Sequence, residues 1–270
     1  YRNWVLYEIP PNSQGVTTLH ILALLEELEV KVEPLSFKRF KLIADVAVPC
    51  YKWRDLNLGD ARYMRLGLEE LLGRRVLEEI RGLRGTSWGR GSSDTLADTT
   101  FYAIADRDGM VVAGIQSLYY PFGSGVTEPR FQVTLNNRAY GFTWEEGLPN
   151  TIGPSKRPLH TLSALVMVDE VQGRIVALGA SGGHFRPQLH AIFATNIVDY
   201  GMNLEEAINN PRAAWDWSSG SMVVERSLGE TPGEARIVDK LGVANAVEVR
   251  GRVRGGATDW RGDGVPIALP

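Results

Sequence analysis

Residues 98–118 read DTTFYAIADRDGMVVAGIQSL, and this stretch decides the fold. Two apolar runs, 100–105 and 110–118, flank an Asp-Arg-Asp-Gly sequence that is typical of a β-hairpin turn. The preceding residues, 84–98, lose hydrophobic periodicity and fill with Gly, Ser and Thr, a composition typical of an exposed, mobile segment. The sequence therefore predicts a strand pair that begins at about Thr99, directly behind a linker.

The residues before this linker favour helices after one short strand. Residues 1–9 predict the strand, and the apolar residues of 17–30 recur at the i, i+3, i+4, i+7 spacing of an amphipathic helix. Those apolar residues are Ile21, Leu24, Leu25 and Leu28. Ser36 is a suitable N-cap for a second helix through about Val48. Residues 58–83 are charged and leucine-rich, and they predict one or two surface helices.

The residues after the linker alternate between strands and helices. Residues 162–169 and 173–181 predict a second hairpin. Helices are expected over 187–200 and from Asn203, where Glu206 completes a capping box. Further strands are expected near 131–135, 221–225 and 246–253. Antiparallel hairpins with helices on their faces predict a layered α+β protein.

The composition excludes several classes of protein. The chain has 270 residues, 44% of them hydrophobic, and a net charge of −3, so no basic surplus points to nucleic acid or to an anionic membrane. It has no apolar run of about 18 residues, so no membrane span is expected. No signal peptide is evident, which favours the cytoplasm, and a start at Tyr1 within a predicted strand indicates a fragment or a processed product.

Cofactor sites are not expected either. The four histidines lack a metal-binding spacing such as HExxH, and no glycine-rich phosphate loop with a lysine is present. The single cysteine, Cys50, excludes an internal disulfide framework and is expected to be a buried small residue. His184 follows a Ser-Gly-Gly sequence and could line a pocket, whereas His20 lies in a leucine-rich helix and is expected to be structural.

Thr99 is a candidate nucleophile with one condition. A threonine at the start of a chain can use its own α-amine as the general base for its hydroxyl, so the Asp98–Thr99 bond would have to be cut first. Backbone N–H groups of Ser181-Gly182-Gly183 could stabilise an oxyanion, because glycines allow close approach to a substrate. Each feature alone is weak: Thr-Thr pairs commonly fill strands, and Ser-Gly-Gly commonly makes turns.

Seven motifs together resemble a known family, the γ-glutamyltranspeptidase-like N-terminal nucleophile (Ntn) hydrolases. In order they are DTTFYAIADRDG, QSLYYPFGSGV, LNNRAYGF, PSKRPLHTLSALVM, GASGG, AINNPRAAWDW and TDWRGDG. The resemblance covers nearly the whole chain, including the first thirty residues. It implies a four-layer αββα sandwich and a precursor that cleaves itself. The new N-terminal threonine is then the nucleophile, with no cofactor.

The resemblance also assigns roles to the candidate catalytic residues. It implies cleavage between Asp98 and Thr99, with Thr99 attacking the substrate carbonyl. Ser117 corresponds to the hydroxyl residue beside the nucleophile. Gly182 and Gly183 correspond to the oxyanion-hole glycines of the family.

The substrate pocket departs from the family pattern. His160 and Thr161 stand where transpeptidases usually have two serines that contact the substrate carboxylate. The positions that hold the glutamate α-amino group appear here as Tyr119, Arg138 and Gly141. A cation at 138 would oppose an ammonium group and suit a carboxylate, which is closer to the acylase and amidohydrolase branch. A structural ion pair is the competing interpretation of Arg138.

By the same resemblance, residues 1–98 are the C-terminal part of a large subunit and 99–270 are the small, catalytic subunit, together forming one domain. The early large-subunit part is absent from this chain. Three functions remain open: a γ-glutamyl hydrolase or transferase, an acylase for another anionic substrate, and an uncleaved non-catalytic relative. The expected partners are a small-molecule amide and the other subunit, with a homo-oligomer left open.

Overall fold

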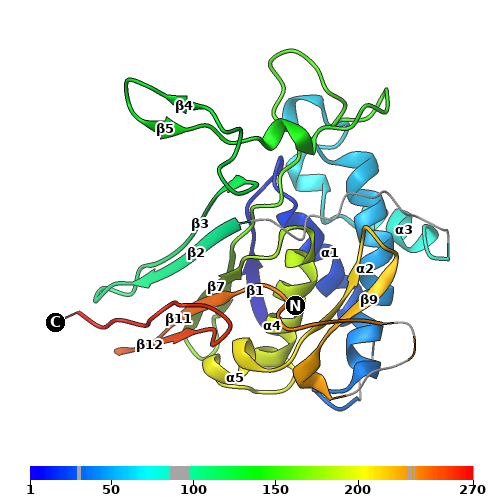
Figure 1. The fold of residues 1–270 in the computed structure, drawn as a ribbon. Coiled ribbons are helices and arrows are strands. Elements are labelled where there is room, and N and C mark those ends of the chain that lie inside the picture. Colours follow the sequence, from blue (N-terminus) through cyan, green and yellow to red (C-terminus); the bar gives the residue numbers. More distant parts are fainter. Residues whose placement is uncertain (29–31, 86–97, 230–232, 234, 270) are drawn as a thin grey trace.

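The computed structural model describes residues 1–28, 32–85, 98–229, 233 and 235–269, and its centre is a five-stranded antiparallel sheet (Figure 1). The strands run in the order β1-β6-β7-β11-β12. They are β1 (Trp4–Tyr7), β6 (Leu165–Asp169), β7 (Arg174–Ala180), β11 (Ala244–Arg250) and β12 (Val253–Thr258). The edge strand β1 pairs with β6 in the register Trp4↔Asp169 to Tyr7↔Val166. The sheet therefore joins strands from both sides of Asp98.

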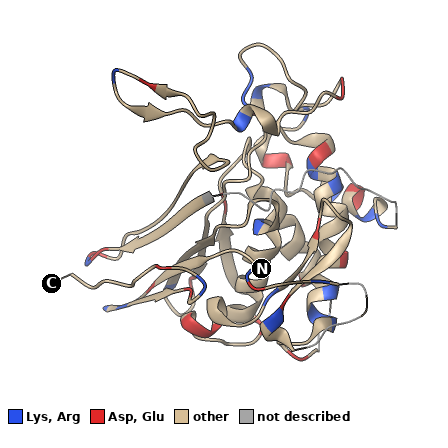
Figure 2. Cartoon of the chain, in the orientation of Figure 1, with Lys and Arg blue, Asp and Glu red and all other residues tan. Residues whose placement is uncertain are grey.

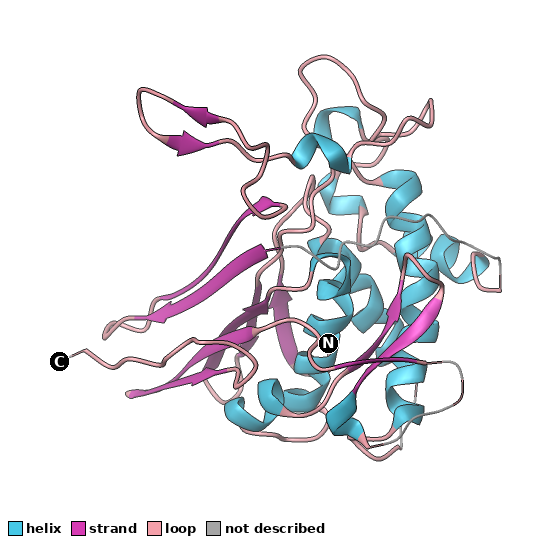
Figure 3. Cartoon of the chain, in the orientation of Figure 1, coloured by secondary structure: helices cyan, strands magenta, loops and turns pink. Residues whose placement is uncertain are grey.

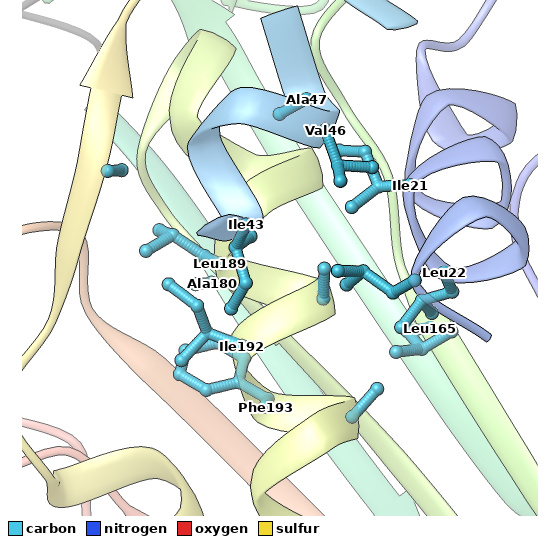
Figure 4. Close-up of a cluster of buried hydrophobic side chains, with 14 of the residues drawn as sticks. Ile21, Leu22, Ile43, Val46, Ala47, Leu165, Ala180, Leu189, Ile192 and Phe193 are labelled. Atoms are coloured by element: carbon cyan, nitrogen blue, oxygen red, sulfur yellow. The ribbon is translucent and has the colours of Figure 1, made fainter. Parts of the chain in front are cut away.

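Helices cover one face of this sheet (Figures 1 and 3). They are α1 (Gly15–Glu26), α2 (Phe37–Asn57), α4 (Arg186–Val198) and α5 (Leu204–Asn209). α4 packs on β7, and α1 and α2 pack on α4. Figure 4 shows the resulting core, with Leu22 of α1 beside Leu165 of β6 and with Ile43 of α2 beside Leu189 of α4. Each such fully buried aliphatic side chain contributes about 1.5–3 kcal/mol, so this interface is the main core.

A strand pair covers the other face of the sheet. β2 (Asp98–Ala105) and β3 (Val111–Tyr119) form the predicted hairpin, and both pack on β7. Val176, Ala177 and Leu178 of β7 are all fully buried, although they point alternately to the two faces of the sheet. The helical layer, the sheet and the hairpin thus make three successive layers, α, β and β, of the expected αββα sandwich. The described residues contain no second helical layer.

The remaining elements lie around these layers. β8, β9 and β10 form a small sheet in which β8 packs against α2, and β4 and β5 form a short separate pair. Their bounds are β4 (Thr127–Glu128), β5 (Val133–Thr134), β8 (Ala213–Asp216), β9 (Ser221–Glu225) and β10 (Arg236–Val238). Figure 2 shows acidic and basic residues interspersed along helices and loops. None of the helices described is long and apolar enough to cross a membrane.

Several predicted boundaries were wrong. The helix capped by Ser36 does not end near Val48 but continues through Pro49 to Asn57. Proline disfavours this, but Cys50, Tyr51 and Trp53 beyond it are buried and hold the helix in the core. The prediction of one or two helices over residues 58–83 is confirmed, because they contain one α-helix, α3 (Arg74–Gly82), beside two short 3₁₀ turns. The predicted linker lies mostly outside the described residues.

Candidate active site

The pairing of β2 with β3 is irregular at Thr99. Asp98 pairs with Tyr119, whereas Thr100 pairs with Gln116, so Thr99 alone lies opposite Ser117 and Leu118. Such a β-bulge redirects side chains and often lies beside functional sites. The residues predicted as nucleophile and neighbouring hydroxyl, Thr99 and Ser117, therefore meet at one point of the strand pair.

The glycine turn at the end of β7 is held in a fixed place. Gly182 and Gly183 have φ values of 136° and 51°, which side chains with a Cβ rarely adopt. Ser181 exchanges backbone and side-chain hydrogen bonds with Val243, each 2.9 Å long. The turn leads into a 3₁₀ turn (Gly183–Phe185) and then into α4. Its backbone N–H groups are therefore near a helix N-terminus, where positive partial charge favours an anion.

A cavity of about 870 Å³ lies where the hairpin and this turn come together. Tyr119, which pairs with Asp98, lines it, and so does His184, which follows Gly183. Thr161 and Gly141, from the segments predicted to bind substrate, line the same cavity. The cavity thus reaches the end of β3, the residue after the glycine turn and two of the predicted substrate residues, whereas Thr99, Ser117, Gly182 and Gly183 are not among the residues that line it.

Arg138 reaches from a 3₁₀ turn (Arg138–Gly141) back to β3. Its Nη2 donates to the carbonyl oxygen of Ser117 at 3.2 Å, and its guanidinium lies 5.6 Å from the ring centre of Tyr119. Among the described side chains it makes no ion pair, and its buried Nη1 lacks a hydrogen-bond partner. Burial lowers the pKa of Arg138. A half-buried cation with one buried, unused donor is suited to an anionic ligand.

His160 and Thr161 lie on a segment that passes close to these charges. Burial, together with the positive charges of Arg138 and Arg186, lowers the pKa of His160 to about 4. Its imidazole is therefore neutral at pH 7. The carbonyl oxygen of Thr161 accepts hydrogen bonds from Gln14 and from Arg186. Arg186 itself is fully buried, and burial lowers its pKa to about 9.

Sequence reasoning did not identify the other wall of the cavity. Arg54 of α2 is buried, and its Nη1 donates to Nδ1 of His184 at 3.1 Å. Because arginine can only donate, Nδ1 of His184 accepts, and the neutral ring carries its proton on Nε2. Trp217 stacks on His184 with 4.9 Å between ring centres and donates to Asp55 at 3.0 Å. No local sequence pattern around Trp217 separates a pocket residue from a packed one.

Within the described ranges, no three His, Cys, Asp or Glu residues are grouped so that they could hold a metal ion. The groups that the site provides are a hydroxyl pair, backbone N–H donors and the half-buried guanidinium of Arg138. This set is suited to nucleophilic attack on a carbonyl and stabilisation of the resulting oxyanion.

Comparison with known sequences agrees with this chemistry. A family model described as gamma-glutamyltranspeptidase matches residues 1–268. The glutathione hydrolase-like YwrD proenzyme of Bacillus subtilis is 30% identical over all of this chain and 55% of its own length. The oxamate amidohydrolase proenzyme of Klebsiella pneumoniae is 28% identical over 83% of this chain and 43% of its own. The chain spans about half the length of such relatives.

Comparison with solved structures supports the fold. Cephalosporin acylase from Bacillus halodurans superposes with a TM-score of 0.83 over 100% of this chain and 52% of its own, at 24% identity. γ-Glutamyltranspeptidase from Pseudomonas nitroreducens superposes with a TM-score of 0.55 over 63% of this chain and 100% of the matched chain. The expected Ntn-hydrolase fold is therefore confirmed.

Proposed function

The chain belongs to the γ-glutamyltranspeptidase family, and we propose that it is an autoprocessed amide hydrolase or acyltransferase whose nucleophile is Thr99. Cleavage of the Asp98–Thr99 bond divides it into residues 1–98, the end of a large subunit, and residues 99–270, the small catalytic subunit. The two remain associated as one domain. The name proenzyme, which the relatives carry, supports this processing.

The proposed reaction has two stages. The free α-amine of Thr99 takes the hydroxyl proton as Oγ attacks the substrate carbonyl, and the N–H groups of Gly182 and Gly183 bind the resulting oxyanion. The amine product leaves with that proton, and an acyl ester of Thr99 remains. Water or an acceptor amine then attacks the ester, giving hydrolysis or transfer. Ser117 helps to orient the Thr99 amine or hydroxyl.

The observation that carries this proposal is that Thr99 lies opposite Ser117 at the bulge, where Asp98 pairs with Tyr119, a residue that lines the cavity. A strand that begins at this point without a functional role could pair regularly with its neighbour, because regular pairing satisfies the backbone hydrogen-bonding groups. Thr99 and Ser117, which are 18 positions apart, were assigned from two separate sequence motifs. Their positions opposite each other in the strand pair support this assignment.

The substrate has two candidate classes. The family and its glutathione hydrolase-like members favour a γ-glutamyl amide. Arg138 favours a different acyl group, one that carries its own carboxylate and no ammonium, because its buried Nη1 has no partner among the described residues. Relatives named oxamate amidohydrolase and acylase ACY 1 fit this second class. We propose that His160, Thr161 and Tyr119 border the acyl group in either case.

Intact mass spectrometry with N-terminal sequencing tests the proposal. The purified protein should contain a polypeptide that begins at Thr99, and Thr99→Ala should abolish both the cut and amide turnover. Thr127→Ala, an exposed threonine on β4, serves as the matched control and should leave both unchanged. Normal cleavage in Thr99→Ala would contradict the assignment. An uncut wild-type protein that does not hydrolyse amides would favour a non-catalytic relative.

A further inference from the structure

Gln14 joins three segments that are distant in sequence. It lies directly before α1 and is fully buried. Its Nε2 donates to the carbonyl oxygen of Gly183 at 2.9 Å and to that of Thr161 at 2.9 Å. Its Oε1 accepts from Nη1 of Arg54 at 3.0 Å. One side-chain amide therefore connects the glycine turn, the predicted substrate segment and α2.

These partners fix the orientation of the amide. Two carbonyl oxygens can be bound only by N–H groups, and a guanidinium can be bound only by an oxygen. The amide therefore cannot rotate by half a turn without losing all three bonds at once. Arg54 is held in turn by Asp55, at 2.7 Å and 2.8 Å, and its guanidinium lies 4.7 Å from the ring centre of Tyr51. Gln14 is thus oriented by a neighbour that is itself fixed.

The backbone around Gln14 strengthens the connection to the substrate segment. The Gln14 amide donates to the carbonyl oxygen of His160 at 3.0 Å, and the His160 amide donates to that of Asn12 at 2.9 Å. Ser13 Oγ donates to the carbonyl oxygen of Leu162 at 2.5 Å. The chain before α1 consequently lies along 160–162 as a short parallel bridge. Through Gln14, this bridged unit also holds the peptide group that follows Gly183.

We propose that Gln14 is a positioning residue for the oxyanion-binding turn, an inference that rests on the proposed role of Gly182 and Gly183. The hydrogen bond to the Gly183 carbonyl fixes the peptide between Gly183 and His184. This peptide directly follows the one that carries the Gly183 N–H, so its position limits the directions in which the turn can present that donor. Those donors act on charge that develops only in the transition state. A misplacement of about 1 Å far from the chemistry can cost about 100-fold in rate.

The matched test compares Gln14→Met with Gln188→Met. Gln188 is also buried, and it exchanges two 2.9 Å hydrogen bonds with the backbone of Trp215 and donates a longer one, 3.4 Å, to the Tyr51 hydroxyl; none of these is to Gly182 or Gly183. Both variants remove a bonded buried amide, so both should lower the melting temperature by a similar amount. Gln14→Met should also lower kcat about 30-fold with KM changed less than about threefold. Gln188→Met should keep both constants within about threefold. Equal kcat losses in the two variants would overturn the proposal.

A measurement that needs no turnover separates this inference from the proposed function. With the protein labelled by ¹⁵N-glycine, Gln14→Met should shift the amide resonances of Gly182 and Gly183, and Gln188→Met should leave them in place. Unshifted resonances in Gln14→Met would overturn the positioning role, whereas undiminished turnover in Thr99→Ala would overturn the proposed function instead. If Gln14→Met does not fold, Gln14→Glu keeps the acceptor for Arg54 but removes both donors, and the same shifts and the same kcat loss are expected.

Discussion

The ring of Phe101 lies so close to Gly179 that a Cβ on this glycine would be 2.5 Å from Phe101 Cε2. Phe101 belongs to β2 and is buried, while Gly179 belongs to β7 of the central sheet. Asn245 adds a hydrogen bond of 2.9 Å to the carbonyl oxygen of Phe101. The hairpin thus packs against the sheet through Phe101, which is only two positions after Thr99. The distance between the hairpin and the sheet is set by this contact, because Gly179 has no side chain.

Gly179→Ala should move the hairpin and slow the cut at Thr99. Real Cβ contacts are never as short as 2.5 Å, so the Phe101 ring must shift; overpacking of this kind costs about 1–3 kcal/mol. Urea denaturation measures that loss, and the rate at which the polypeptide beginning at Thr99 appears measures the displacement. Gly256→Ala on β12 is the control, because its Cβ would meet nothing closer than 3.5 Å. Equal behaviour of the two variants would contradict the prediction.

Arg138→Gln should change the selectivity between anionic and neutral substrates more than it changes the turnover of all substrates. If the guanidinium binds an acyl carboxylate, its loss removes a charged hydrogen bond of about 1.5–3 kcal/mol, and kcat/KM for an oxamate-type substrate should fall about 10- to 100-fold. Neutral short amides should lose less than about threefold. Arg130→Gln, on an exposed loop, controls for the general loss of a positive charge. A γ-glutamyl anilide that proves to be the better substrate of the wild-type protein would contradict this use of Arg138.

Asp259→Asn should cost a large share of the stability. Asp259 accepts from Arg212 at 2.5 Å and from Arg261 at 2.9 Å, and all three side chains are buried. Neutralising Asp259 leaves the buried Arg212 without its ion-pair partner, although Arg261 keeps its pair with Glu225, and a broken buried pair costs about 3–5 kcal/mol. Asp239→Asn breaks only the exposed pair with Arg226 and should cost less than about 1 kcal/mol. Calorimetric or urea unfolding of both variants makes the comparison, and similar losses would refute it.

The Asp259 carboxylate should also make the stability of the protein depend on pH. Burial opposes ionisation of Asp259, but Arg212 and the Arg261 amide outweigh it and hold the pKa below its usual range. A carboxylate with a lowered folded-state pKa contributes stability that is complete above its unfolded pKa of about 3.9 and is lost as the pH falls below that value. The wild-type protein should therefore lose stability below about pH 4 more steeply than Asp259→Asn. Parallel acid-unfolding curves would argue against this contribution.

Cys50 should be unreactive in the folded protein. It is fully buried in α2, and burial raises the pKa of its thiol, so almost no thiolate is present near pH 8. Ellman's reagent should label the native protein at least about 100-fold more slowly than the urea-unfolded protein, because only unfolding exposes the thiolate. Rapid labelling without urea would place the thiol at an accessible surface and contradict its burial.

Local signals in the sequence predicted local structure well. Asn203 and Glu206 form the expected capping box, and Ser36 caps α2 through the amide of Arg39. The hairpin turn at Asp106 to Gly109 is also where it was predicted. These features depend on residues within about four positions of one another, so their physical causes are visible in a short window of sequence.

Features that depend on distant contacts were missed. Strand β8 (Ala213–Asp216) and the continuation of α2 past Pro49 are imposed by tertiary packing, which overrides local propensity. No local pattern around Gln14 indicated that its side-chain amide would be buried and bonded to Gly183 and Thr161. Thr99 and Ser117 were paired in advance only through the family resemblance, which carries three-dimensional information that a single sequence does not display.

The pairing of β1 with β6 has a kinetic consequence. A cut after Asp98 would change the covalent connectivity of the chain and leave the sheet intact, because β1, α1 and α2 precede the cut and their partners follow it. Neither product could diffuse away without unfolding the shared core. Once denatured, however, the two polypeptides would have to find each other again. Renaturation of the cut protein would then follow second-order kinetics and slow on dilution, whereas the uncut precursor would refold at a rate independent of concentration.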